Sequence, residues 1–392
     1  MLDSSTETCR LCQRIRLQKR LALLLIFLLW AAPWGSHAAA AGYDVVDLYT
    51  IAPKLLASNL LYARTGQVAA GGQLISGSGV YADSGVFTDL TPTLLLGLSS
   101  TIVNATNGIQ QVGRGGASAS PTNSHALLWN GTAESAVDLH PTLLGPFDSS
   151  TAYGNNGTQQ VGSGSYFLSE HAILWTGTPQ SAVNLNPVGY FRSRALGTDG
   201  VHQVGYSNST NGASPNAILW KGSADSAVSL DPIRLGHFFG SFAEAVCANQ
   251  QVGYTQASFQ GVGLRAVLWT GTADSAIDLN PTNLAGYRSS QARGTNGRRQ
   301  VGYASESSLP MAPQAMIWSG TADSAVSLQA LLPGDFIYSD AYSVDNLGNV
   351  FGVATDSSGN THAIEWAAVP EPSSLMTMAG IAVFGLCRRK VR

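Results

Sequence analysis

Residues 159–185 read QQVGSGSYFLSEHAILWTGTPQSAVNL, and the pattern of this stretch recurs along most of the chain. In each copy a tryptophan is followed two residues later by glycine and ten residues later by leucine, and a Gln-Val-Gly tripeptide stands upstream. The five clearest copies contain Trp129, Trp175, Trp220, Trp269 and Trp318, and a sixth, partial copy ends at Trp366. Such regular spacing indicates a repeat architecture, in which each unit buries its apolar face against its neighbours.

Alternation of apolar and polar residues predicts four short strands in each unit. In the quoted copy we expect strands at Ser149–Tyr153, Gln159–Gly164, His171–Trp175 and Ser181–Leu185. The Asn156-Gly157 pair between the first two favours a tight hairpin, because both residues tolerate positive φ. Four antiparallel strands about every 45 residues is typical of a blade of a β-propeller.

The two ends of the repeat region predict how the ring closes. The last copy stops at Trp366 without its fourth strand, whereas Tyr43–Leu48 resembles the fourth-strand sequence Ser135–Leu139. We therefore expect the N-terminal strand to complete the last blade. Small residues on the first strands, where inner strands crowd around an axis, also favour a propeller: Ala152, Ala195, Ala243 and Ala292.

The predicted fold is therefore an all-β, seven-bladed β-propeller over residues 43–366, closed by the N-terminal strand. The number seven counts residues 49–90 as a divergent, shortened first blade that contains Thr65-Gly66-Gln67-Val68. If those residues are only a lead-in, the ring has six blades. A signal peptide and a short C-terminal apolar helix flank this domain in the prediction.

Composition excludes two classes of protein. Only 11% of the residues are charged and 44% are hydrophobic, so the chain does not have the low hydrophobicity and high charge of a disordered protein. Residues 41–370 hold 12 Lys and Arg against 21 Asp and Glu, a net charge of −9. Nucleic acid is not an expected partner, because its phosphates require a basic surface.

The first 40 residues have the order of a secretory signal peptide: basic residues, the apolar run 21–32, then small residues. We expect signal peptidase to cleave in the region of Ala38 and Ala40. An uncleaved anchor is the alternative, although the apolar run is shorter than the roughly 20 residues that span a bilayer. Cys9 and Cys12 would leave with the peptide, and we interpret Cys247 as a buried or turn-lining thiol.

The C-terminus resembles a PEP-CTERM sorting signal over residues 369–392. It contains Pro370-Glu371-Pro372, an apolar stretch over residues 375–387, and a basic cluster with Arg388, Arg389 and Lys390. The resemblance implies processing near the tripeptide by an exosortase and delivery to the cell surface or extracellular space. The basic cluster would remain in the cytoplasm during a transient insertion into the inner membrane. A plain transmembrane tail is the alternative.

The repeats are similar to the HAF family of exported bacterial repeats. The similarity rests on a His-Ala-x-x-Trp strand that begins at His125, His171 and His362. The other copies have Asn216, Arg265 and Gln314 at the histidine position, so we expect these side chains to form structural hydrogen bonds rather than a metal site. The family is defined by its pattern and by export, which implies no particular reaction.

We predict no catalytic, cofactor-binding or metal residues. Each copy supplies at most one acidic residue before its fourth strand, fewer oxygens than Ca²⁺ takes, so we expect these acids to cap turns. They are Glu134, Asp225, Asp274 and Asp323. The connections from the fourth strand to the next first strand are a candidate ligand face, because loops on a rigid scaffold often carry function. Its candidate residues are Tyr190, Arg192, His237, Tyr287 and Arg288.

The sequence favours an exported, non-enzymatic binding or structural protein of the cell surface or extracellular matrix. Extracellular polysaccharide and matrix proteins are the partner classes that we expect. The alternative is a hydrolase or lyase that acts on an extracellular polysaccharide, with acidic residues such as Asp199, Glu244 and Asp335 converging at the propeller axis.

Overall fold

The computed structural model describes residues 42–48, 74–76, 79–81, 87–95, 97–98, 100–117, 123–209, 214–236, 238–257, 263–307 and 312–369. The predicted signal peptide with Ala38 and Ala40 lies outside these residues. So do the predicted C-terminal apolar helix and the sorting-signal residues Pro370, Glu371, Pro372, Arg388, Arg389 and Lys390.

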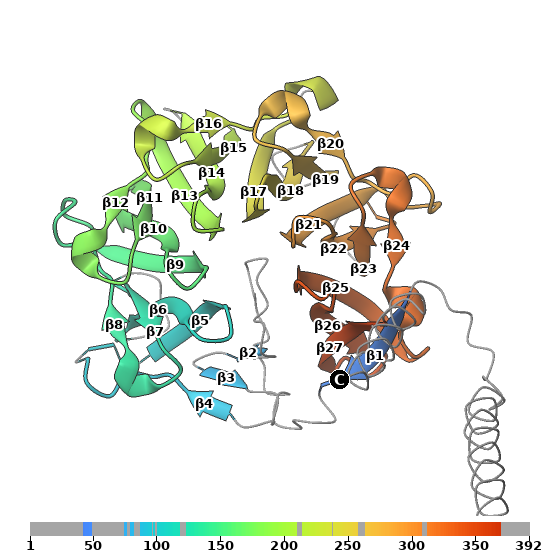
Figure 1. Ribbon diagram of the computed structural model, residues 1–392, viewed down its shortest axis with the longest axis horizontal. Helices are drawn as coiled ribbons and strands as arrows, with labels where there is room; N and C mark the ends of the chain where they lie inside the picture. Colours follow the sequence, from blue (N-terminus) through green and yellow to red (C-terminus); the bar gives the residue numbers. More distant parts are fainter. Residues whose placement is uncertain are drawn as a thin grey trace, which may run out of the picture. The chain divides into compact units, whose positions relative to one another are not determined.

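The described strands form antiparallel sheets that follow the chain (Figure 1). The first complete sheet contains β5 (Ser100–Thr106), β6 (Gln111–Gly116), β7 (His125–Trp129) and β8 (Val137–Asp138). The second contains β9 (Ser149–Asn155), β10 (Gln160–Tyr166), β11 (Ser169–Trp175) and β12 (Val183–Asn184). The third contains β13 (Tyr190–Thr198), β14 (Gln203–Ser209), β15 (Pro215–Trp220) and β16 (Val228–Ser229). A parallel bridge between Glu170 and Arg192 joins the second and third sheets.

Three further sheets repeat this order. The fourth contains β17 (Gly240–Cys247), β18 (Gln250–Gln256), β19 (Leu264–Trp269) and β20 (Ile277–Asp278). The fifth contains β21 (Ser289–Thr295), β22 (Gln300–Ser305), β23 (Gln314–Trp318) and β24 (Val326–Ser327). The last contains β25 (Phe336–Val344), β26 (Val350–Asp356), β27 (Thr361–Ala368) and β1 (Tyr43–Asp47). The prediction of an all-β protein built from four-stranded antiparallel sheets is confirmed.

The predicted pairing of the N-terminal strand is also confirmed. Strand β1 runs antiparallel to β27, with Val45 opposite Trp366, and the Leu48 N–H donates to the Ala363 carbonyl at 2.9 Å (Figure 1). Asp47 accepts a 2.9 Å hydrogen bond from the His362 ring. The N-terminal segment thus supplies the fourth strand that the last copy of the repeat lacks.

A smaller sheet precedes the complete ones. It contains β2 (Leu74–Ser76), β3 (Gly79–Tyr81) and β4 (Phe87–Asp89), in that order. It falls within residues 49–90, where a shortened first unit was predicted, and the Thr65–Val68 segment of that prediction lies outside the described residues.

The first three strands of the repeat agree with the prediction to within two residues at each end, but the fourth strand is shorter than predicted. In the quoted copy the strand covers only Val183–Asn184, and the 3-10 helix Pro179–Ser181 stands where it was expected to begin. Ser181 explains the difference, because its Oγ accepts the Thr176 N–H at 2.8 Å and donates to the Thr178 carbonyl at 2.6 Å. Equivalent helices are Ala133–Ser135, Ala224–Ser226, Ala273–Ser275 and Ala322–Ser324, and two others are Ile233–Leu235 and Gln329–Leu331.

Each residue of the Gln-Val-Gly tripeptide has a separate structural role. The Gln160 Oε1 accepts the N–H of Gly177 at 2.8 Å and so fixes the turn after the tryptophan. Val161 is fully buried in the core. Gly162 lies opposite Ala152 at a β-bulge, where a Cβ would come within 1.9 Å of the Thr151 carbonyl oxygen. Only glycine fits so close to the backbone of the neighbouring strand.

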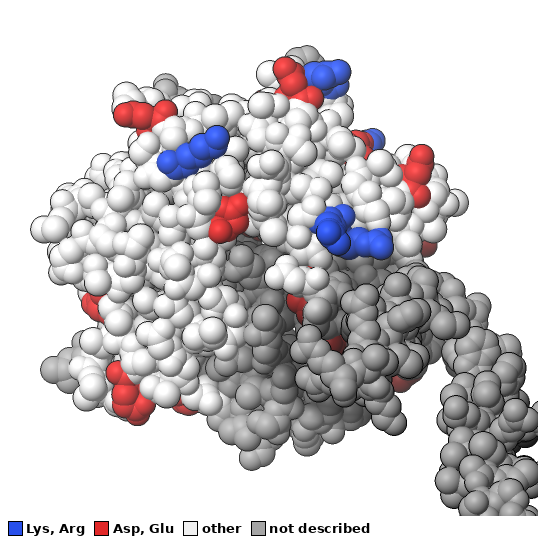
Figure 2. Space-filling view, viewed as in Figure 1, with Lys and Arg blue, Asp and Glu red and all other residues white. Residues whose placement is uncertain are grey.

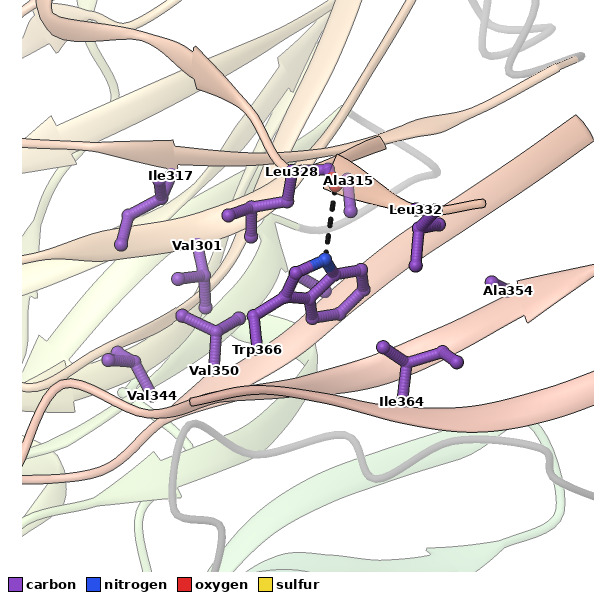
Figure 3. Close-up of a cluster of buried hydrophobic side chains, with 11 residues drawn as sticks. Val301, Ala315, Ile317, Leu328, Leu332, Val344, Val350, Ala354, Ile364 and Trp366 are labelled. Atoms are coloured by element: carbon purple, nitrogen blue, oxygen red, sulfur yellow. Dashed lines mark hydrogen bonds between the residues drawn. The ribbon is translucent and has the colours of Figure 1, made fainter. Parts of the chain in front are cut away.

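The repeat tryptophans of the last five complete sheets pack each sheet against the one before it, as predicted, and Trp129 of the first complete sheet packs with Leu90, which follows β4. All six are fully buried. Trp366 of β27 lies among Val301, Ala315 and Leu328 of the preceding sheet and donates its Nε1–H to the Leu328 carbonyl at 3.1 Å (Figure 3). Large aromatic rings in such positions dominate the energetics of packing between sheets.

A buried serine on each of several first strands also links neighbouring sheets, and the sequence analysis did not predict it. Ser290 Oγ accepts the N–H of Ala266, on the third strand of the preceding sheet, at 3.0 Å and donates to Asn280 Oδ1 at 2.9 Å. The same link to the preceding sheet is made by Ser150, Ser193, Ser241 and Ser339. Each link satisfies a backbone donor that would otherwise be buried without a partner.

Candidate functional site

The strongest concentration of buried charge lies on the first strands of three consecutive sheets. Arg293 of β21 forms a bidentate ion pair with Asp340 of β25, with Nε–Oδ1 and NH2–Oδ2 distances of 3.0 and 2.9 Å. The guanidinium carbon lies 5.2 Å from the centre of the Tyr303 ring and 5.1 Å from that of Tyr342. Glu244 of β17 is buried nearby and interacts electrostatically with Arg293. We call these five residues the Arg293 cluster.

Burial and charge act against each other in the Arg293 cluster. Burial raises the pKa of Asp340, and the neighbouring guanidinium opposes that shift. Burial alone would lower the pKa of Arg293, but Asp340 and the surrounding tyrosines and Glu244 raise it. Burial and the two nearby carboxylates raise the pKa of Tyr303 to about 12, although Arg293 acts in the opposite direction. The arginine and the tyrosine therefore keep their protons at neutral pH.

A second arginine is held in a similar way between the second and third sheets. Arg194 of β13 pairs with both carboxylate oxygens of Glu170, at 2.8 and 3.0 Å, and Ser163 donates to the same carboxylate at 2.6 Å. The rings of Tyr153 and Tyr206 lie 5.0 and 5.7 Å from its guanidinium carbon. Each arginine is thus engaged by a carboxylate at its edge and by aromatic rings at its faces, an arrangement that ties adjacent sheets together.

The sequence reasoning named only Glu244 among these residues. The sequence did contain one signal for them. Arg194, Arg293 and Asp340 each lie next to the small residue of a first strand and place a charge where most other copies have none. Their pairing was not visible, since the partners are 24 and 47 residues apart in sequence.

The three acids of the alternative enzymatic reading lie at different points in or beside the first strands of their sheets. Asp199 lies in the β13–β14 turn and binds the His202 ring at 3.2 Å. Asp335 lies just before β25, where its carbonyl accepts the Ser357 N–H at 2.8 Å. These two acids therefore flank opposite ends of first strands, and only Glu244 belongs to the Arg293 cluster.

The candidate ligand face divides into separate groups. Arg192 is exposed, and its Nε donates to the Leu168 carbonyl at 2.9 Å, so it lies beside the β10–β11 turn, while Tyr190 begins β13 and pairs with Ser209 of β14. Tyr287 donates its hydroxyl to Gln314 Oε1, and Arg288 is exposed. Among the described residues no hydrogen bond, ion pair or ring contact joins the two groups, and His237 lies outside the described residues.

The repeat histidines pair with the fourth strand of their own sheet, as expected. His125 Nδ1 lies 2.7 Å from Asp138 Oδ2, and the His171 ring lies 3.1 Å from the Asn184 amide. Arg265, at the same repeat position, reaches Asp278 at 2.6 Å. Among the described residues no group of three or more His, Cys, Asp or Glu is arranged to hold a metal ion.

The acidic residues before the fourth strands lie in the first turn of the short 3-10 helices, and the serine that follows each acid makes the hydrogen bonds that close the turn. Cys247 ends β17 and is half-buried beside Gly297 of the next sheet, and burial raises the pKa of its thiol. A raised thiol pKa disfavours the nucleophilic thiolate.

On the face in Figure 2 the surface is mostly uncharged, and the Lys, Arg, Asp and Glu side chains form small scattered groups, in some of which opposite charges adjoin. Such a surface does not resemble the continuous basic stripe of a nucleic-acid-binding protein. Within the described part of the chain, no helix has the length and apolar character needed to cross a bilayer.

Comparisons with known proteins identify the C-terminal segment. A model of the PEP-CTERM protein-sorting motif matches residues 368–392. The comparison with curated proteins gives no match. A solved structure of a puromycin hydrolase mutant complexed with PGG is similar over 81% of this chain and 52% of that chain, with 12% sequence identity and a TM-score of 0.45. This chain thus corresponds to about half the length of that protein.

The motif indicates an exported protein that is directed to the cell surface, and PEP-CTERM signals are generally processed by an exosortase.

Proposed function

We propose that residues 43–366 form a closed, seven-bladed β-propeller of HAF-type repeats, in which the β2–β4 sheet belongs to a shortened first blade. Three observations on the last sheet support closure by the N-terminal strand: the β1–β27 ladder, the bond between Asp47 and His362, and the packing of Val45 on the Trp366 core. A linear stack of repeats would need distinct caps at its ends instead of a shared sheet.

In this proposal the protein is a non-enzymatic binding or structural module, and its body binds an extracellular polysaccharide or matrix protein. The observation that carries the export and surface location is the sorting motif over residues 368–392. The engagement of the buried arginines by carboxylates supports a structural use of the buried charges. Signal peptidase, exosortase and a transient C-terminal membrane insertion complete the route to the surface.

Mass spectrometry of the mature termini in a producing cell tests the route. The expected N-terminus lies between residues 39 and 42, and the expected C-terminus lies near Pro370-Glu371-Pro372. A mature protein that retains the basic C-terminal cluster would contradict processing by an exosortase.

Co-sedimentation with the isolated extracellular polysaccharide and matrix of the producing cells tests the binding role. The processed protein should sediment with this material in a saturable manner. Albumin is the control that should stay in the supernatant. If the processed protein stays there as well, the binding role is wrong, whatever the outcome for processing.

The alternative function is a polysaccharide hydrolase or lyase, and the Arg293 cluster is the observation that favours it. Two buried carboxylates, Glu244 and Asp340, lie around one arginine, and pairs of carboxylates serve acid–base chemistry in glycosidases. An assay for new reducing ends or unsaturated sugars tests this function. Activity that is lost in Glu244→Gln but kept in Asp199→Asn would replace the non-enzymatic proposal.

A further inference from the structure

The tip of the β10–β11 hairpin is an exposed apolar surface. Tyr166 pairs with Ser169 to close the hairpin, and between them Phe167 is 91% exposed and Leu168 58% exposed. Phe191, at the start of β13, is 40% exposed and accepts the Ser169 hydroxyl at its carbonyl at 3.1 Å. We call Tyr166, Phe167, Leu168 and Phe191 the Phe167 patch.

The hairpin holds this apolar tip in a strained conformation. Phe167 has a φ of 50°, in the left-handed region, which is strained for a residue with a large side chain. Its N–H donates to Asp148 Oδ2 at 3.2 Å, and the Leu168 carbonyl accepts Arg192 Nε at 2.9 Å. The turn is therefore fixed from both sides while its side chains face solvent.

The corresponding turn of the last sheet shows that the scaffold does not require an apolar tip. Between β26 and β27, Ser357, Ser358 and Gly359 occupy the exposed positions, and Asp356 closes the turn by accepting the Asn360 N–H at 2.8 Å. An exposed apolar group on a strained, rigid turn is typical of a surface that binds another molecule.

The charged residues beside the patch indicate what kind of partner it can bind. Exposed Asp148 lies on the β9 side of the hairpin and exposed Arg192 on the β13 side, while Glu170 is neutralised by Arg194. The patch is therefore locally neutral in a body that carries a net charge of −9. Two copies can therefore approach each other at this patch without repulsion between like charges at the contact.

We propose that the Phe167 patch binds a second copy of this chain through a two-fold symmetric contact. A two-fold axis through the hairpin tip, perpendicular to the plane of the sheet, places the two Phe167 tips against each other and brings Arg192 of each copy opposite Asp148 of the other. Such a contact is self-complementary, as a symmetric dimer requires. The small size of the patch makes this a weak, concentration-dependent dimer.

Sedimentation velocity on the exported protein, over about 5 to 500 μM, tests the proposal in the range expected for a weak interface. The wild-type mass should rise from monomer toward dimer across this range. Phe167→Gly should remain a monomer while folding at least as well, because glycine accepts the left-handed conformation without strain. Leu347→Ser, which removes an 82% exposed leucine from the β25–β26 turn, is the matched control and should dimerise like the wild type.

A charge exchange separates a specific contact from general stickiness. Arg192→Glu and Asp148→Lys should each remain monomeric, because each places two like-charged pairs in the contact. Mixed in equal amounts they should form a heterodimer, because both pairs are then of opposite charge. A wild-type protein that stays monomeric to the highest concentration, a Phe167→Gly protein that still dimerises, or folded charge variants that do not associate on mixing would each overturn the proposal.

Discussion

Replacing Gly253 by alanine is expected to destabilise the protein far more than the same change at Gly271 or Gly334. Gly253 is the glycine of the fourth Gln-Val-Gly tripeptide and lies opposite Ala243 in the β17–β18 ladder, next to a bulge. A Cβ there would lie 1.9 Å from the Phe242 carbonyl oxygen, whereas real Cβ contacts essentially never fall below 3.0 Å. The two strands must therefore separate by about 1.1 Å, the difference between these distances, because the contacted atom belongs to the backbone.

A displacement of that size breaks hydrogen bonds on both sides of the bulge and disturbs the buried Val252 beside it. Overpacking of a close-packed core costs about 1 to 3 kcal/mol, and each weakened hydrogen bond adds about 1 kcal/mol. We expect Gly253→Ala to lower the free energy of unfolding by about 3 to 5 kcal/mol.

Two other glycines calibrate the measurement. At Gly271 an added Cβ meets nothing within 4 Å, but φ is +91°, so Gly271→Ala should cost only the backbone strain of about 1 to 2 kcal/mol. At Gly334 the space is open and φ is not positive, so Gly334→Ala should be neutral to within about 0.5 kcal/mol. Urea denaturation followed by the fluorescence of the buried tryptophans measures all three. Equal effects at Gly253 and Gly334 would refute the role assigned to the bulge glycine.

Three further predictions follow from the links between strands. Removal of residues 42–48 should leave Trp366 open to water, since β1 covers that sheet edge, and acrylamide quenching of tryptophan fluorescence should increase; unchanged quenching would contradict the pairing. Ser290→Ala should lower stability by about 1 to 3 kcal/mol in urea denaturation, because the Ala266 N–H loses its buried acceptor, and a shift of the unfolding midpoint no larger than that of Gly334→Ala would contradict this. Burial, together with the adjacent His125, lowers the pKa of His140, so the folded protein binds this proton less readily than the unfolded chain does. Neutral His140 therefore contributes its full stabilisation above the unfolded pKa of about 6.5, and the protein loses stability as the pH falls below that value. In the next sheet an asparagine accepts the corresponding serine hydroxyl, and His140→Asn copies that residue. The variant should lose less stability than the wild type between pH 7 and pH 5 in thermal unfolding scans. An equal loss in both proteins would refute the assignment of this pH dependence to His140.

The repeat itself made much of the fold predictable. Strands one to three could be placed because the alternation of side chains is local, and the packing of the tryptophans followed from their fixed spacing. The fourth strand was placed too long, since one serine hydroxyl commits its first residues to a 3-10 turn and propensity does not reveal that bond. The hydrogen bonding of the repeat histidines was predictable because Arg265 can replace histidine as a donor but not as a metal ligand.

The candidate sites depended on contacts between residues far apart in the chain. Glu244 could be named as an off-pattern acid, but its association with Arg293 required three consecutive sheets to be in place. Tyr190 and Arg192 could be named from a loop pattern, whereas the apolar hairpin tip beside Arg192 was not predicted, because the strand alternation predicts nothing about which turn residues are exposed.

The amino-acid order alone thus determined the repeating unit, the C-terminal sorting segment, and the pairing of the first strand with the last sheet, since each depends on contiguous residues or on fixed intervals. Only the tertiary structure decided why the bulge glycines cannot be replaced, which serine links each sheet to the next, and where the buried arginines find their carboxylates. The serine and arginine links arise when sheets pack against each other, because packing brings groups 24 to 47 residues apart in sequence within hydrogen-bonding distance and removes the water that would otherwise satisfy them. The bulge glycines are fixed by the close approach of two strands within one sheet.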